Sequence, residues 1–167
     1  RSLVGSEMCI RDSGYTALCP LDTKQISIQS YRHFVGEMKH YLHPRIQGIH
    51  KVELWTSGFS AYLQDKHIKT ISLSAVSGTQ STAQAQNALC TQIDAGIPIP
   101  FLMLNNKNKS LKDYVWHWFL LNGYRETETG LQVQTVTYGS AQWEDFSKLW
   151  DTGYQQKGGM ILLHSEI

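Results

Sequence analysis

The sequence predicts a single α+β domain in which helices come first and an antiparallel sheet follows. Apolar residues three and four positions apart dominate the first half of the chain, and short apolar runs bounded by turn residues dominate the second half. Helices followed by strands, rather than alternating with them, are typical of the α+β class. With 167 residues and 41% hydrophobic content, the chain is long enough to bury one core without disulfides or a structural metal.

Residues 1–13 (RSLVGSEMCIRDS) show neither a helical nor a strand period. The string SEMCIRDS resembles translated sequencing-adaptor DNA, which would make these residues a non-native scar and leave the natural start of the protein missing. The alternative is an ordinary disordered N-terminus. In both cases we expect residues 1–13 to lie outside a domain that spans 14–167.

Two helices are expected at the start of the domain. Apolar positions between Tyr31 and Leu42 step by three and four, and Ser27 or Ser30 can cap the helix that they predict. A second, shorter helix is expected over residues 55–64, with its aromatic residues on the buried side.

A strand and a third helix follow. Alternating polar and apolar residues over 68–76 predict the strand. The third helix is expected to begin at Ser81 and to end before Gly96, since glycine suits the left-handed position after a helix.

From residue 97 onward, the pattern predicts an antiparallel sheet. The expected elements are strands over 97–104, 114–124, 131–138 and 160–163, a polar loop over 105–112, a turn over 126–130 and a short helix over 143–150. Within that helix, Phe146, Leu149 and Trp150 have the spacing of a face that packs against the sheet.

Composition excludes several functional classes. Lys plus Arg number 15 against 14 for Asp plus Glu, a balance that argues against binding to nucleic acid phosphates. The longest apolar runs are far shorter than the roughly 20 residues that a membrane span needs. Cys9, Cys19 and Cys90 form no C-x-x-C pair, so neither a zinc knuckle nor a redox pair is predicted, and so few thiols favour a reducing compartment such as the cytoplasm.

No cofactor or metal site is predicted. Neither G-x-x-x-x-G-K-[ST] nor G-x-G-x-x-G occurs in the chain. His33, His40 and His43 lie at helical spacing, but Glu37 is the carboxylate that accompanies them and H-E-x-x-H is absent. We expect these histidines to lie on a solvated helix face.

The segment VWHWFLLNGY, residues 115–124, contains the strongest candidate for chemistry. His117 is a lone polar residue at the start of an apolar strand, and Gly123 and Tyr124 follow it after five residues. Burying an imidazole among aromatic rings costs free energy unless a polar partner satisfies it. We therefore expect a polar side chain opposite His117.

This arrangement resembles the histidine strand of papain-like cysteine peptidases, in which His, five residues and Gly-Tyr recur. The order upstream, a helix, a Gly-Ile-Pro strand (residues 96–98) and a loop, is similar to the bacteriocin-processing, double-glycine peptidase branch of that superfamily. The resemblance covers roughly residues 25–163. It implies a papain-like fold, a cysteine nucleophile at a helix N-terminus and His117 as the group that takes and returns the proton.

The chain departs from this family at two points. None of its three cysteines opens a helix in a Cys-Gly stretch, so we expect the nucleophile helix to have been lost with the natural start of the protein. Val136 stands where the family has the asparagine that orients the histidine, so Thr135 or Thr137 is expected to take that role, and the candidate catalytic pair is His117 and Thr137.

Two functions are therefore expected from the resemblance. The first is a cysteine-peptidase-like domain that hydrolyses a peptide or amide bond in the complete protein and is inactive with the sequence given. The alternative is a non-catalytic peptide-binding or structural module of the same fold. In both, Trp116, Trp118 and Tyr138 are the candidate residues of a groove for a peptide or small amide substrate, although both tryptophans can also be packing residues.

Overall fold

The computed structural model describes residues 26–46 and 48–165. The extension expected over residues 1–13 lies outside this part of the chain. Among the described residues, no helix has both the length and the apolar character to cross a membrane.

The described chain forms a mixture of helices and one antiparallel sheet. The helices are α2 (Ile28–Leu42), α3 (Val52–Asp65), α4 (Thr82–Asp94), the 3-10 helix η2 (Lys109–Tyr114) and α5 (Phe146–Trp150). The strands are β1 (Ile71–Ser77), β2 (Ile99–Met103), β3 (His117–Thr127), β4 (Gly130–Thr137), β5 (Ser140–Asp145) and β6 (Gly159–Ser165). The sheet has the order β1-β6-β2-β3-β4-β5, and every neighbouring pair is antiparallel. The predicted α+β class is confirmed.

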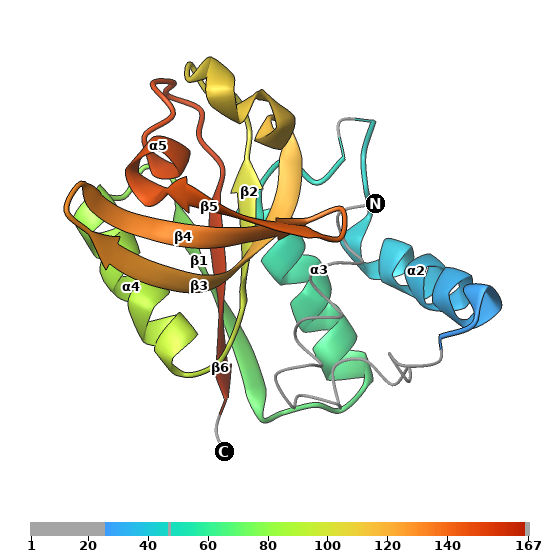
Figure 1. Ribbon diagram of the computed structural model, residues 1–167. Helices are drawn as coiled ribbons and strands as arrows, with labels where there is room; N and C mark the ends of the chain where they lie inside the picture. The colour runs from blue at the N-terminus through green and yellow to red at the C-terminus, as the bar shows by residue number, and fades with distance from the viewer. Residues whose placement is uncertain (1–25, 47, 166–167) are drawn as a thin grey trace.

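Helices cover both faces of the sheet (Figure 1). On one face, α2 and α3 bury their apolar stripes against residues of β2 and β6 such as Leu102 and Ile161. On the other, α4, α5 and η2 pack against the alternate residues of the same strands, including Phe101 and Met160. Because successive strand residues point to opposite faces, β6 and β2 contribute to both cores and carry continuous apolar runs, residues 160–163 and Ile99–Met103.

Helices α2 and α4 form where local sequence predicts them. Ser27 caps α2 by accepting a hydrogen bond from the Ser30 backbone N–H at 3.0 Å. Ser81 and Gln84 form a reciprocal capping box at the start of α4, and Gly96 follows that helix with φ of 75°. Helix α3 begins at Val52, three residues before its predicted start, and its N-terminus has no side-chain cap.

The segment over 143–150 differs from the prediction. Its first part belongs to strand β5, and only Phe146–Trp150 is helical. Tyr138 and Gly139 have φ of 49° and 75°, the positive values that a two-residue type I′ hairpin turn requires, so the chain returns along β4. The predicted burial of Phe146, Leu149 and Trp150 is confirmed.

Two smaller corrections concern the middle of the chain. The expected polar loop contains η2, and Tyr114 ends that helix instead of beginning the next strand. Strand β3 therefore starts at His117, and it continues to Thr127, through part of the expected turn.

Candidate functional site

His117 occupies the first position of a central strand. It pairs with Met103 of β2, and its strand lies between β2 and β4 in the sheet. Its ring lies on the same face as Phe119 two residues later, with the ring centroids 6.4 Å apart. This face is the one that α4 and α5 cover farther along the sheet. The prediction that His117 lies at the start of a strand of the antiparallel sheet is confirmed.

A hydroxyl of the neighbouring strand satisfies the imidazole. His117 Nε2 lies 2.6 Å from Thr137 Oγ1. The ring also stacks on Tyr138, with centroids 4.9 Å apart and planes 11° from parallel. The expected polar partner is therefore present, and it is Thr137. Thr135 is only 1% exposed and instead bonds to the Tyr114 hydroxyl at 2.9 Å and to the Gln142 carbonyl at 3.2 Å.

A bulge in β3 brings the pair together. The register between β3 and β4 shifts between Leu121 and Gly123, so that Asn122 is an extra residue and Leu121 lies opposite Thr135. An extra residue moves the remainder of a strand to the opposite face relative to its partner. Without the bulge, Thr137 would face away from His117.

The backbone on either side of the pair adopts an uncommon conformation. Trp116, directly before His117, has φ of 54°, and Tyr138, directly after Thr137, has φ of 49°. Left-handed conformations cost bulky residues on the order of 1–2 kcal/mol. Trp116 is held there by hydrogen bonds from its N–H to the Leu104 carbonyl at 2.9 Å and from its Nε1 to Asn105 Oδ1 at 3.1 Å. The surrounding structure thus stabilises the backbone that presents His117 and Thr137.

The surroundings of His117 favour a neutral imidazole. Burial lowers the pKa of His117 below its ordinary value. Within the described chain, no carboxylate lies at ion-pair distance from the ring to oppose this effect. When Nε2 carries the proton and donates it to Thr137 Oγ1, Nδ1 keeps its lone pair and can accept a proton from another group.

This lowered pKa predicts acid destabilisation. Because the unfolded chain binds the proton more readily than the folded one, the free energy of unfolding should fall as pH drops below about 6.5, until the folded pKa is passed. His117→Gln should remove this component, whereas His33→Gln on the exposed face of α2 should retain it. Melting temperatures of the three proteins between pH 8 and pH 5 measure the effect. Parallel losses in all three would show that His117 is not desolvated.

The aromatic candidates divide between the two faces. Trp116 and Tyr138 are 47% and 70% exposed and flank His117 in sequence or in space. Trp118 lies on the opposite face, where its Nε1 donates to the Ile49 carbonyl at 2.7 Å and its ring packs on Trp55 with centroids 6.2 Å apart. The structure therefore brings Trp116 and Tyr138 to the site, and it gives Trp118 a packing role.

A pocket of about 490 Å³ adjoins His117 through the two residues that it contacts. We call it the β4–β5 pocket. Its lining comes from η2 (Ser110, Asp113, Tyr114), the end of β4 with its turn (Thr135, Thr137, Tyr138) and β5 (Ser140, Gln142, Glu144). The sequence prediction of a groove beside His117 missed most of these residues, because they are brought together from three separate segments.

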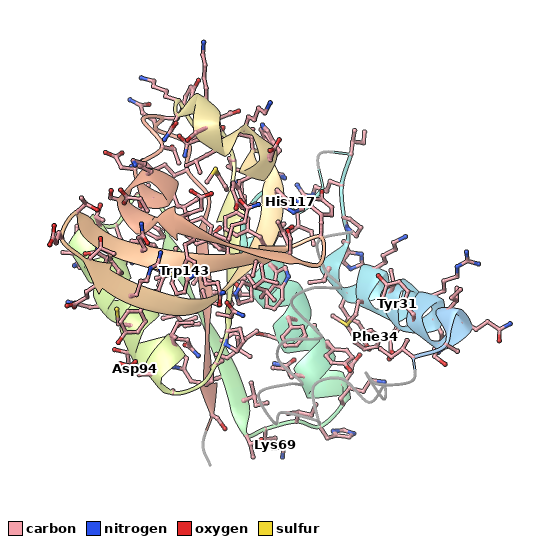
Figure 2. All side chains as sticks on the ribbon, in the orientation of Figure 1. Tyr31, Phe34, Lys69, Asp94, His117 and Trp143 are labelled. Carbon is pink, nitrogen blue, oxygen red and sulfur yellow. The ribbon has the colours of Figure 1, made fainter. Side chains whose placement is uncertain are left out.

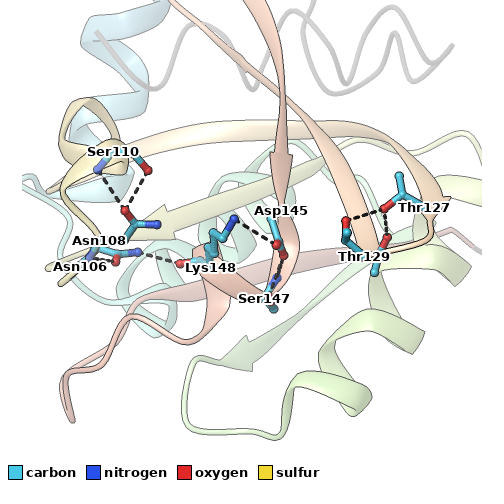
Figure 3. Close-up of polar contacts among 9 residues, drawn as sticks. Asn106, Asn108, Ser110, Thr127, Thr129, Asp145, Ser147 and Lys148 are labelled. Carbon is cyan, nitrogen blue, oxygen red and sulfur yellow. Dashed lines mark hydrogen bonds and ion pairs between the residues drawn. The ribbon is translucent and has the colours of Figure 1, made fainter.

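Short polar caps hold the elements around this pocket (Figure 3). Asn108 Oδ1 accepts from the Ser110 N–H at 3.0 Å at the start of η2, and Asp145 Oδ1 accepts from the Ser147 N–H at 3.0 Å at the start of α5. Asn106 Nδ2 donates to the Lys148 carbonyl at 2.9 Å and so ties the segment before η2 to α5. In sequence, these caps are indicated by an Asn or Asp whose side chain can accept from the backbone N–H two residues later, at the first turn of a helix.

Cys90 is not placed to act with His117. It lies on α4 beside Tyr124, and burial raises the pKa of its thiol. Tyr124 follows His117 by seven strand residues, which correspond to about 23 Å along β3. Asp94, the hydrogen-bond partner of Tyr124, is labelled far from His117 in Figure 2. Cys9 and Cys19 lie outside the described residues.

The remaining histidines form no metal site. His33, His40 and His43 are exposed on or just after α2, as expected. Across residues 26–46 and 48–165, no three His, Cys, Asp or Glu side chains gather in a metal-binding arrangement.

The fold and the site together define an α+β domain with a sheet-borne histidine beside a polar pocket. Comparisons of the chain with models of known families, with curated proteins and with solved structures find no match.

Proposed function

We propose that this chain is a papain-like, cysteine-peptidase-like domain that holds a peptide or amide group at His117. The observation that carries the proposal is the position of His117, a desolvated imidazole at the start of a central antiparallel strand with Nε2 bonded to a hydroxyl of the next strand. A neutral imidazole with one nitrogen fixed and the other able to accept a proton is what a general base requires.

In thiol-dependent amide hydrolysis, the base takes the proton from the thiol as sulfur attacks the carbonyl carbon, and it returns the proton to the amine as the C–N bond breaks. The same base then takes a proton from the water that cleaves the resulting thioester and returns it to the sulfur. His117 would take and return that proton, and Thr137 would act as a positioning residue. The Thr137 hydroxyl can orient the ring but has no charge with which to stabilise an imidazolium. This pair is therefore a weaker base system than one with an orienting carboxylate.

Cys90 does not supply the thiol, because it lies near the opposite end of β3 and has a raised pKa. We therefore propose that the chain with this sequence binds its peptide without thiol-dependent hydrolysis. The exposed rings of Trp116 and Tyr138 support the second candidate function, a non-catalytic peptide-binding module, because exposed aromatic rings are common anchors in binding surfaces.

The chain should therefore show no His117-dependent thiol labelling. The test is reaction with an iodoacetamide probe at pH 7, followed by mass-spectrometric location of the label in the unmodified chain and in His117→Ala. Reaction with Cys90 should be slow in both, since burial disfavours its thiolate. Fast labelling of Cys19 or Cys90 that is lost in His117→Ala would contradict this and favour a complete enzyme.

A binding measurement separates the proposal from a purely structural role. Short peptides should shift the backbone NMR signals of Thr137 and Tyr138, and His117→Gln should weaken this binding. Trp118→Phe, which keeps an aromatic ring on the opposite face, is the control and should bind as the unmodified chain does. If no peptide binds and no substrate is hydrolysed, the proposed function is wrong.

A further inference from the structure

The β4–β5 pocket has an unbalanced chemical lining. Six of its nine lining residues contribute hydroxyl groups, and Asp113 and Glu144 contribute carboxylates. No lysine, arginine or histidine is among the lining residues. Lys148, which lies near Glu144 in sequence, pairs with Asp145 at 3.4 Å. The pocket therefore offers many hydrogen-bond acceptors and negative charge, with no cation of its own.

Glu144 is the more buried of the two carboxylates in the pocket, since Asp113 is exposed. Its carboxylate is half-buried and accepts a long hydrogen bond of 3.5 Å at Oε1 from the Tyr114 hydroxyl. Within the described residues, no lysine or arginine forms an ion pair with it. Burial is the largest influence on the pKa of Glu144 and raises it, while the Tyr114 hydroxyl and the charge of nearby Lys148 act in the opposite direction without cancelling it. A positively charged donor in the pocket would give Glu144 the direct ion pair that Lys148, which pairs with Asp145, does not form.

The surrounding hydroxyls are held in place. The Tyr114 hydroxyl and Thr135 Oγ1 lie 2.9 Å apart on two nearly buried residues. Thr137 and Tyr138 belong both to the pocket and to the contacts of His117. A group bound in the pocket would therefore lie next to the imidazole. It could belong to the same peptide that is held at His117.

We infer that the β4–β5 pocket binds the ammonium or guanidinium group of a lysine or arginine side chain in the peptide held at His117. This inference rests on the proposed function for the peptide as the source of the cation. Both side chains carry several N–H donors and a positive charge on a flexible stem, which matches a pocket lined by hydroxyls with a carboxylate in its wall. A charge-assisted bond to a partly buried carboxylate is stronger than a neutral hydrogen bond.

The test compares two acetylated, amidated peptides, Gly-Gly-Lys-Gly-Gly and the same peptide with norleucine in place of lysine. The two central side chains have similar apolar stems and differ in charge. We expect the lysine peptide to bind roughly tenfold more tightly at low ionic strength and to lose most of this preference in Glu144→Gln. Glu126→Gln, on the exposed distal part of β3, is the control and should keep the preference. Asp113→Asn, at an exposed residue, provides a second variant should Glu144→Gln fail to fold.

The probe n-butylammonium separates failure of the inference from failure of the proposed function, with n-butanol as its neutral counterpart. Equal affinity for both peptides, weakened by His117→Gln, would overturn the inference and leave the proposed function standing. If no peptide binds but n-butylammonium shifts the NMR signals of Thr135 and Thr137 in a Glu144-dependent way, the proposed function is overturned and the cation pocket is retained. Binding of neither peptide nor n-butylammonium would overturn both.

Discussion

Gly158→Ala is expected to destabilise the domain severely. A Cβ atom at Gly158 would overlap the carbonyl oxygen of Leu102 and would lie 2.6 Å from the carbonyl carbon of that residue. The obstructing atoms belong to the backbone of β2, which is hydrogen-bonded to β3 on one side and β6 on the other and cannot move aside. The Gly158 carbonyl also accepts a hydrogen bond from the Gly78 N–H at 3.0 Å, so its own backbone is held as well.

A clash between a new Cβ atom and the backbone of a central strand belongs to the exceptional class of substitutions that cost more than about 4 kcal/mol. That loss is a large fraction of the roughly 5–15 kcal/mol by which a domain is stable. Urea denaturation followed by circular dichroism measures it. Gly36→Ala is the matched control: a Cβ there meets nothing within 4 Å in the middle of α2, and the change should raise stability by about 0.5–1 kcal/mol. An unchanged midpoint for Gly158→Ala would show that β2 and β6 do not approach in this way.

Trp150→Ala is expected to cost on the order of 3–5 kcal/mol. Trp150 is almost fully buried, its ring stacks on Phe146 with centroids 5.7 Å apart, and it meets Phe101 of β2 edge-on at 6.0 Å. Its Nε1 donates to the Gln80 carbonyl at 2.9 Å, so α5 is tied to the turn before α4 as well as to the sheet. Truncation would leave a cavity and an unsatisfied carbonyl group.

Trp143→Ala is the control for this second prediction. Trp143 is 38% exposed on β5, and Arg125 lies over its ring at 4.3 Å. Loss of an exposed cation–π contact costs about 0.5–1 kcal/mol. The urea midpoint of Trp143→Ala should therefore fall much less than that of Trp150→Ala. Similar losses in both variants would mean that α5 is peripheral to the core.

Several elements could be predicted from local sequence because their causes are local. Helix α4 has both halves of its capping box, Ser81 and Gln84, within four residues, and Gly96 provides its termination. The apolar stripe of α5 is equally local. Strand β5 was missed because an edge strand with Ser140 to Trp143 all exposed carries no alternating apolar pattern. The local feature that indicates β5 is the tight turn at Tyr138 and Gly139, which returns the chain along β4.

The candidate site was predictable in part. His117 was identified because a polar residue in an apolar strand requires a partner, a consequence of desolvation that holds in any fold. Strand alternation alone places Trp118 on the face opposite His117. Its packing role could not be predicted in the same way, because the ring of Trp55 and the Ile49 carbonyl reach it only in the folded chain. The β4–β5 pocket was likewise outside the reach of sequence patterns, since η2, β4 and β5 meet only in the folded chain.

By itself, the sequence determined the α+β class, the helices with local caps and the singular position of His117 in an apolar strand. Only the tertiary structure decided that Thr137, rather than Thr135, contacts the imidazole. Both threonines lie on one face of β4, so their spacing in sequence cannot distinguish them. The physical reason lies first in the strand register, which places Thr135 opposite Leu121 and leaves Thr137 nearer the end of β3 where His117 lies. It lies second in the packing of Tyr114, whose hydroxyl is bonded to that of Thr135.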